Sequence, residues 1–313
     1  MLKRLLTGAV ILAIYVPLLV VKELYPLFQI LMMALAGFAA YEMINLFEHR
    51  HKFPLVVKII IIISTILIYW AFVSEYGSDT IASRVSTNLN IKIGFIPTLL
   101  IIVIVFLGLM VVYDDFNGAS IGRALTTILY TSLGFGTLTL LRATGLEYVL
   151  YLYIITMLTD TFAYVFGRLF GKHKMSPKIS PKKTWEGAIG GTLLACAVAV
   201  AFAFLYNKCL SDPVLHDNFC IFNNNATWLR FFEKFNKVQS VCFVVFITII
   251  GSIMGQIGDL VASKFKRTYD VKDFSDIFPG HGGVLDRFDS AIYCGMFLWG
   301  LFLIFNNLVS IFL

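Results

Sequence analysis

Long apolar stretches separated by short polar segments dominate the chain. A helix needs about 20 apolar residues to cross the hydrocarbon core of a bilayer. Nine stretches approach that length, at residues 5–22, 24–47, 54–74, 94–112, 122–141, 147–167, 187–206, 238–258 and 289–311. The pattern predicts an all-α, polytopic integral membrane protein with about nine transmembrane helices.

The composition agrees with this pattern, because 58% of the 313 residues are hydrophobic and only 14% are charged. Such values exclude an ordinary soluble domain. The first apolar stretch follows Lys3 and Arg4, and no small-residue cleavage pattern closes it. We therefore interpret it as a retained anchor instead of a signal peptide. The formal net charge of +6 is modest, and no nucleic-acid partner is expected.

The positive charges predict an orientation. Most of the 25 Lys and Arg residues share one side of the membrane if the N-terminus is cytoplasmic. Because basic residues accumulate in cytoplasmic loops, we expect a cytoplasmic N-terminus. The two most charged segments, residues 168–186 and 259–288, then lie on the cytoplasmic face.

The segment after the eighth apolar stretch is rich in acidic and basic residues that could form a functional site. If the eighth helix continues into it, one polar stripe comprises Asp259, Ser263, Lys266 and Asp270. The following "FPGHGG" ends any helix and lets backbone N–H groups turn toward an anion. Asp286 and Asp289 then share one face at the start of the ninth helix. We therefore expect two helix ends to bring carboxylates together across a glycine turn.

Carboxylates alternating with Lys and Arg beside a flexible loop favour Mg²⁺ and a polyphosphate, since Mg²⁺ prefers a few carboxylates plus phosphate oxygens. A plainer interpretation is that the acids favour a helix N-terminus and the glycines only form a turn. A mere connector does not need so many charged residues against a membrane, so the whole run favours a working site.

A second stretch, "TDTFAYVFGRLFGKHKMSPKISPKKTWEG", covers residues 159–187. Asp160 lies inside an apolar stretch, where an acid usually faces a polar cavity or a partner. We expect it to serve a metal or substrate site. Pro177 and Pro181 predict an ordered, non-helical path for the lysines that follow. These lysines either clamp phosphates or reflect cytoplasmic topology, and the two interpretations are equally weighted.

Other candidates lie inside or beside the apolar stretches. Glu42 either pairs with a cation such as Arg50 or decorates the membrane interface. Cysteines inside apolar stretches, namely Cys196, Cys242 and Cys294, are predicted to be small core residues. Cys209 and Cys220 share a polar segment, and whether they pair is left open.

The run "SKFKRTYDVKDFSDIFPGHGGVLDRFDS", residues 263–290, resembles the signature of the phosphatidate cytidylyltransferases, also called CDP-diacylglycerol synthases. The matching residues are Ser263, Lys266, Arg267, Lys272, Asp273, Ser275, Phe278, Pro279, His281, Gly282, Gly283, Asp286, Arg287 and Asp289. Residues 159–187 resemble a second stretch shared by this family.

The resemblance implies an enzyme of phospholipid biosynthesis that joins CTP and phosphatidate to give CDP-diacylglycerol and pyrophosphate. It implies Mg²⁺ as the cofactor, with a second metal ion left open. Residues 1–141 would be N-terminal transmembrane helices, and residues 142–313 the catalytic region. The bilayer is the implied environment, with a bacterial plasma membrane and a cytoplasmic active site expected. Whether the protein forms a homodimer is left open.

The resemblance also suggests roles for individual residues. Asp259 and Asp286 are the predicted metal ligands, with Asp160 and Asp289 further candidates. The predicted catalytic set comprises Asp259, Lys266, Arg267, Lys272, Asp273, His281, Asp286, Arg287 and Asp289. The predicted substrate-binding set comprises Ser180, Lys182, Lys183, Thr184, Ser263, Gly282 and Gly283.

Two other functions compete with this prediction: a cytidylyltransferase for another lipid phosphate, and a multi-span transporter. Charge concentrated on one membrane face disfavours a transporter, whose site lies near the bilayer midplane. A CDP-alcohol phosphotransferase is disfavoured because its Asp-Gly-x-x-Ala-Arg pattern is absent.

Overall fold

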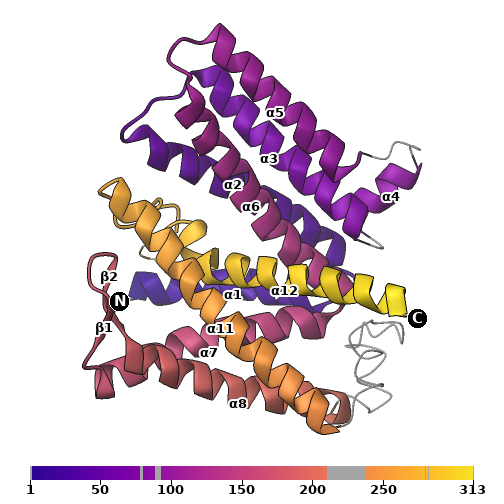
Figure 1. Ribbon diagram of the computed structural model, residues 1–313, viewed down its shortest axis with the longest axis vertical. Helices are drawn as coiled ribbons and strands as arrows, with labels where there is room; N and C mark the ends of the chain where they lie inside the picture. The colour runs from indigo at the N-terminus through magenta and orange to yellow at the C-terminus, as the bar shows by residue number, and fades with distance from the viewer. Residues whose placement is uncertain are drawn as a thin grey trace. The chain divides into compact units, whose positions relative to one another are not determined.

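A computed structural model describes residues 2–77, 80–88, 93–209, 237–278, 280 and 282–312. It consists of helices and one short hairpin (Figure 1). In chain order the elements are α1 (Leu2–Val20), α2 (Tyr25–Glu48), α3 (Leu55–Tyr76), α4 (Ile81–Asn88), α5 (Phe95–Val112), α6 (Gly118–Thr144), α7 (Leu146–Phe170), β1 (Lys174–Ser176), β2 (Ser180–Thr184), α8 (Trp185–Cys209), α11 (Lys237–Thr268) and α12 (Leu285–Phe312).

Each predicted apolar stretch corresponds to a helix. Within the described residues, 8 helices are long and apolar enough to cross a membrane, and Thr7–Val20 of α1 forms a shorter apolar helix. The predicted all-α, polytopic membrane architecture is confirmed, and the chain is an integral membrane protein.

The helix α4 was not predicted, because its sequence is short and polar. Its start is stabilised locally. The Thr80 hydroxyl oxygen accepts a hydrogen bond from the Ser83 N–H at 3.1 Å, and the Ser83 hydroxyl donates to the Thr80 carbonyl at 2.9 Å. These bonds satisfy groups that a helix start leaves without intrahelical partners.

The chain forms two compact units, and the first comprises Met1–Ala143 and Phe265–Phe288. In this unit α3 packs against α2, α4 and α5. The Tyr69 hydroxyl on α3 donates to the Gln29 carbonyl of α2 at 3.1 Å and shares a 2.7 Å hydrogen bond with Thr139 of α6. At the other end of α2, Glu48 contacts Lys58 of α3 at 2.6 Å. Polar contacts at both ends therefore fix the register of these helices.

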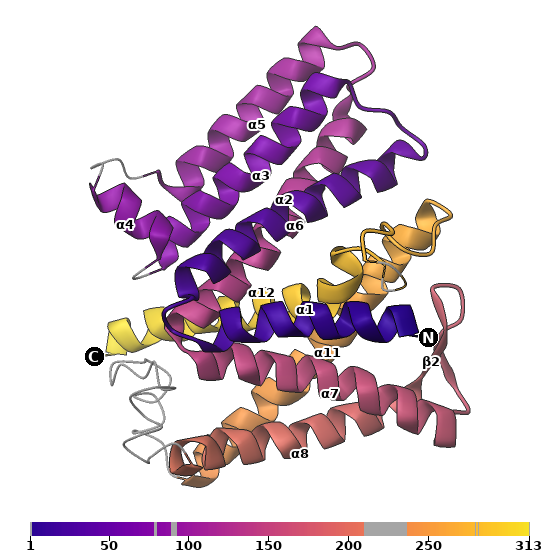
Figure 2. The same ribbon diagram turned by 180° about the vertical axis from the view of Figure 1, so that it is seen from behind.

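The second unit comprises Thr144–Lys264 and Asp289–Leu313. Its helices α7 and α8 lie side by side (Figure 2). Strands β1 and β2 form an antiparallel hairpin between them, in which Lys174 pairs with Thr184 and Ser176 with Ser180. The Thr184 hydroxyl accepts the Gly187 N–H at 3.2 Å and so caps α8. The predicted ordered, non-helical path is confirmed as this hairpin.

The close approach of α7 and α8 depends on small residues. A Cβ atom on Gly187 would lie 2.9 Å from the Gly167 Cα, and one on Gly191 would lie 2.8 Å from the Ala163 backbone nitrogen. Both distances are shorter than van der Waals contact. The spacing of Gly187 and Gly191 is the small-xxx-small pattern by which membrane helices bring their backbones together.

The cysteine predictions are confirmed in part. Cys196 and Cys294 are buried, as expected for small core residues. The prediction for Cys242 is wrong, because its side chain is exposed on α11. An exposed apolar side chain on a membrane helix suits contact with lipid instead of a protein core. The question of a Cys209–Cys220 pair lies outside the described residues.

Candidate active site

The signature begins on the last turns of α11, which continues to Thr268. Asp259, Ser263 and Lys266 are therefore helical, but the predicted extension of the stripe to Asp270 is wrong. The Val271 N–H donates to the Lys266 carbonyl at 3.0 Å, and Asp270 adopts a φ of 59°. These are features of a Schellman motif, which ends a helix with a left-handed residue. The Asp270 carboxylate instead contacts Arg50 at 2.8 Å.

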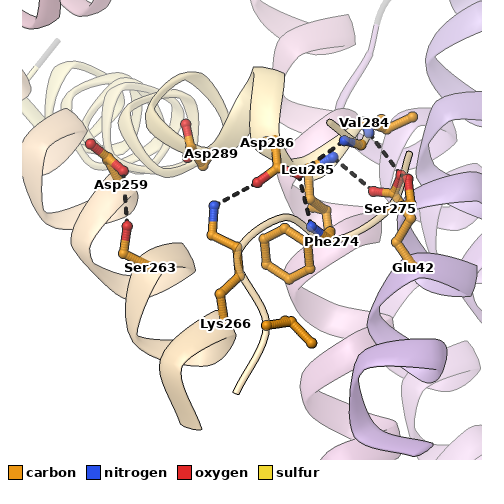
Figure 3. A network of polar contacts seen from close by, with 12 residues as sticks. Glu42, Asp259, Ser263, Lys266, Phe274, Ser275, Val284, Leu285, Asp286 and Asp289 are labelled. Carbon is orange, nitrogen blue, oxygen red and sulfur yellow. Dashed lines mark hydrogen bonds and ion pairs between the residues drawn. The ribbon is translucent and has the colours of Figure 1, made fainter. Parts of the chain in front are cut away.

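Lys266 and Asp286 form a nearly buried ion pair in the first unit (Figure 3). Their charged atoms lie 2.5 Å apart, and the side chains are 11% and 3% exposed, respectively. The Lys266 ammonium also lies 5.2 Å from the centre of the Phe274 ring. Two residues of the predicted catalytic set are thus brought together by the end of α11 and the start of α12.

The second carboxylate oxygen of Asp286 binds the backbone of the loop. It accepts the Phe274 N–H at 2.8 Å and the Gly283 N–H at 2.9 Å. Gly282 has a φ of +78°, a conformation that glycine adopts without a steric cost. The Gly283 N–H thus turns toward an anion that is a carboxylate of the protein itself, and binding of a substrate anion by this loop stays a prediction.

Glu42 was misread from the sequence. Its side chain is fully buried, so it does not decorate an interface, and it does not pair with Arg50. It accepts hydrogen bonds from the Ser275 hydroxyl at 2.5 Å, the Val284 N–H at 2.8 Å and the Leu285 N–H at 2.9 Å (Figure 3). An acid inside an apolar stretch indicates that the side chain needs polar partners. Those partners could not be predicted, because they lie more than 230 positions away along the chain.

A second charged cluster occupies the second unit. Asp259 contacts the Lys183 ammonium at 2.5 Å and accepts the Ser263 hydroxyl at 3.3 Å. Asp160 accepts the Ser290 hydroxyl at 3.1 Å. Asp259 and Lys183 are both close enough to Asp160 to interact with it electrostatically. The structure therefore joins an acid and a lysine of the 159–187 stretch to the first acid of the 259–288 segment.

A buried polar network in the same unit was not predicted. The Ser252 hydroxyl hydrogen bonds with Thr159 and with Thr192, each at 2.8 Å, and the Gln256 side-chain N–H donates to Thr192 at 3.0 Å. Thr159 is the neighbour of Asp160. Hydroxyl and amide residues within the apolar stretches were the available signal, since such groups need partners when they are buried.

The remaining predicted residues divide between surface and interior. Exposed members are Lys182, Arg267, Lys272, Asp273 and Arg287. Thr184 is buried and its hydroxyl caps α8, whereas Ser180 is half-buried in β2. Asp289 accepts the Ser290 N–H at 2.7 Å. His281 lies outside the described residues.

The predicted metal ligands come from both units. Asp160 and Asp259 belong to the second unit and Asp286 to the first, so the approach of Asp259 to Asp286 stays a prediction. Within the described ranges, no three His, Cys, Asp or Glu side chains gather into a metal-binding group. A metal ion held by one or two of these carboxylates would take its remaining oxygen ligands from water or a substrate.

Comparison with known proteins identifies the family. The model of the cytidylyltransferase family matches residues 2–305. The chain belongs to the cytidylyltransferase family. The match covers the N-terminal helices as well as the signature, and the family generally uses a divalent metal.

Curated relatives carry a more specific name. The chain is 44% identical over 169 residues to a phosphatidate cytidylyltransferase of Staphylococcus haemolyticus (strain JCSC1435) and 43% identical over 169 residues to one of Staphylococcus aureus (strain COL). Each match covers 54% of this chain and 54% of the relative. The chain thus spans about half the length of the curated relatives it matches. The predicted family is confirmed.

Proposed function

We propose that this chain is a phosphatidate cytidylyltransferase, which transfers CMP from CTP to phosphatidate. The observation that carries the proposal is the contact of Lys183 with Asp259 beside Asp160. This contact unites the two stretches that resemble the family. The names of the staphylococcal relatives support the same activity.

The proposed reaction joins two anions. A phosphate oxygen of phosphatidate attacks the α-phosphorus of CTP, and a new P–O bond forms. The bond from that phosphorus to the oxygen bridging to the β-phosphate breaks, and pyrophosphate leaves with the electron pair. Catalysis by positioning and charge stabilisation requires no protein nucleophile. Exposed Arg267, Lys272 and Arg287 in the first unit are cations of the kind that bind phosphate groups.

The donor set fits a divalent cofactor, which we take to be Mg²⁺. Asp160 and Asp259 carry two carboxylates close enough to interact, and Lys183 compensates only part of their charge. We propose that these two carboxylates hold the ion together with phosphate oxygens of CTP. A bound Mg²⁺ would neutralise the triphosphate and stabilise the charge that develops on it. Asp286 is the less suited ligand, since both its oxygens accept protein donors.

The proposed location is the inner membrane of a bacterium, with the site facing the cytoplasm. The charged hairpin and the signature loop support this orientation, since basic loops remain cytoplasmic. The lipid substrate can then stay in the bilayer while CTP arrives from water.

The decisive experiment is an assay of the purified chain in detergent with CTP, phosphatidate and MgCl₂. We expect pyrophosphate release that requires all three, and its loss when EDTA removes the divalent ion. Asp259→Asn should reduce turnover by at least about 100-fold, because it removes a charge from the proposed cation site.

The matched control is Asp270→Asn. Asp270 also lies in the signature region, but it is exposed and pairs with Arg50 on the surface. Asparagine tolerates its left-handed backbone, so activity should stay within about twofold of wild type. No lipid-dependent pyrophosphate from the wild type would refute the proposal. Turnover with a different lipid phosphate in place of phosphatidate would assign the alternative substrate.

A further inference from the structure

Glu42 lies on α2, far along the chain from the signature, yet it contacts the signature loop at three points. One carboxylate oxygen accepts the Ser275 hydroxyl and the Val284 N–H, and the other accepts the Leu285 N–H (Figure 3). The side chain is 0% exposed. A carboxylate is costly to bury unless donors surround it. These contacts therefore define one favoured position for the loop against α2.

Two of the three donors belong to the start of α12, which begins at Leu285. The first N–H groups of a helix have no intrahelical partners and carry partial positive charge. Glu42 satisfies two such groups from another helix. Because Asp286 and Arg287 are the next residues, their positions follow from where Glu42 fixes the helix start.

The loop is also shaped around Glu42. A Cβ atom on Gly283 would lie 2.7 Å from the Glu42 carboxyl carbon and 2.8 Å from the Ser275 hydroxyl oxygen. The absence of a side chain at Gly283 thus gives the Glu42 carboxylate its room. The Gly283 N–H in turn donates to Asp286 at 2.9 Å. Glu42 and Asp286 therefore both hold the short segment that joins the loop to α12.

We propose that Glu42 is a positioning residue for cytidylyl transfer. It holds the start of α12 so that exposed Arg287 is positioned to bind phosphate groups of CTP. This role rests on the proposed function. Glu42 itself does not touch substrate, because its carboxylate is enclosed by the loop and α2.

The first test is Glu42→Gln, which keeps the size of the side chain. The amide nitrogen would point a donor at a backbone N–H, so the loop should loosen. We expect kcat/KM for CTP to fall by about tenfold or more, with KM for phosphatidate within about twofold of wild type. A general loss of stability would not lower kcat/KM for CTP while leaving KM for phosphatidate unchanged.

Hydrogen–deuterium exchange of the full chain in detergent gives a second measurement that does not depend on activity. In Glu42→Gln, peptides covering residues 274–286 should exchange about tenfold faster or more, because the Val284 and Leu285 N–H groups lose a charged acceptor. Peptides from α3 should exchange as in wild type.

Ile68→Ala is the matched control. Ile68 is 0% exposed on α3, next to Tyr69, which contacts Gln29 near the far end of α2. Its truncation leaves a cavity on α3 in the same unit. Below its melting temperature, this variant should keep its kcat/KM for CTP and the wild-type exchange of residues 274–286.

Gly283→Ala disrupts the same contact by a change in the loop, because the added methyl group would displace Glu42 or Ser275. It should reproduce both effects of Glu42→Gln. If the wild type is active and Glu42→Gln keeps the wild-type hydrogen exchange and the wild-type kcat/KM for CTP, the positioning role alone is overturned. A wild type without lipid-dependent pyrophosphate release would overturn the proposed function and, with it, the role of Glu42 in transfer.

Discussion

Asp286 is held by charge and by backbone donors together. One oxygen contacts Lys266, and the other accepts the N–H groups of Phe274 and Gly283. Hydrogen bonds to an ionised acceptor are stronger than those between neutral groups. The carboxylate thereby ties the end of α11, the loop and the start of α12 within the first unit.

At this scale we predict that Lys266→Met destabilises the protein. It removes the cation from a pair whose side chains are 11% and 3% exposed, so the Asp286 charge stays buried without compensation. The free energy of unfolding should fall by about 3–5 kcal/mol. Loss of helical circular dichroism during titration with SDS would measure the change.

The double variant Lys266→Met with Asp286→Asn supplies the control, because it removes both charges. It should recover part of the lost stability, since the asparagine carbonyl can still accept a backbone N–H. A double variant no more stable than Lys266→Met would show that the two charges are not energetically coupled.

Among the elements, the contact between α7 and α8 decides where Asp160 and Lys183 lie. Asp160 is on α7, and Lys183 is on the strand that runs directly into α8. Gly187 and Gly191 let the two backbones approach closely. Helix packing in the second unit therefore sets the geometry of its charged cluster.

We predict that Gly187→Ala damages this geometry. Its methyl group would lie 2.9 Å from the Gly167 Cα and force the helices apart. Such overpacking costs about 1–3 kcal/mol, and turnover should fall because Lys183 moves relative to Asp160. Thermal unfolding in detergent and pyrophosphate release would report both effects.

Gly300→Ala is the comparison for that substitution. Gly300 is on α12, and nothing lies within 4 Å of an added Cβ. Replacing a helical glycine with alanine there should stabilise the protein by up to about 1 kcal/mol and leave turnover unchanged. Equal effects of the two substitutions would contradict the packing argument.

The elements were predictable to the extent that they depend on local sequence. The long helices follow from the length of the apolar stretches, and Pro177 and Pro181 excluded a helix where the hairpin forms. The end of α11 was placed too late, because a non-glycine residue, Asp270, takes the left-handed position. Glu42 could be noticed but not interpreted, since its partners depend on how α2 packs against the loop.

For the whole molecule, the distribution of positive charge predicts which parts face the cytoplasm. Lys178 lies exposed at the turn of the β1–β2 hairpin, and Lys22 lies exposed between α1 and α2. By the predicted topology, the hairpin is cytoplasmic and Lys22 is on the opposite side.

Cysteine labelling tests this orientation. After replacement of the 5 native cysteines, Lys178→Cys should react with a membrane-impermeant maleimide only in permeabilised cells. Lys22→Cys should react in intact cells as well. Labelling of Lys178→Cys in intact cells would place the hairpin, and the proposed site with it, on the wrong side for CTP.

The fit of Glu42 against Gly283 bears on how this region can be transplanted or redesigned. A segment copied from residues 263–290 into another scaffold would lack Glu42, whose carboxylate packs against Gly283. Its helix start would then lack an acceptor and its turn would have room to collapse. Grafts should therefore include α2, and sequence libraries should vary positions 42 and 283 as a pair.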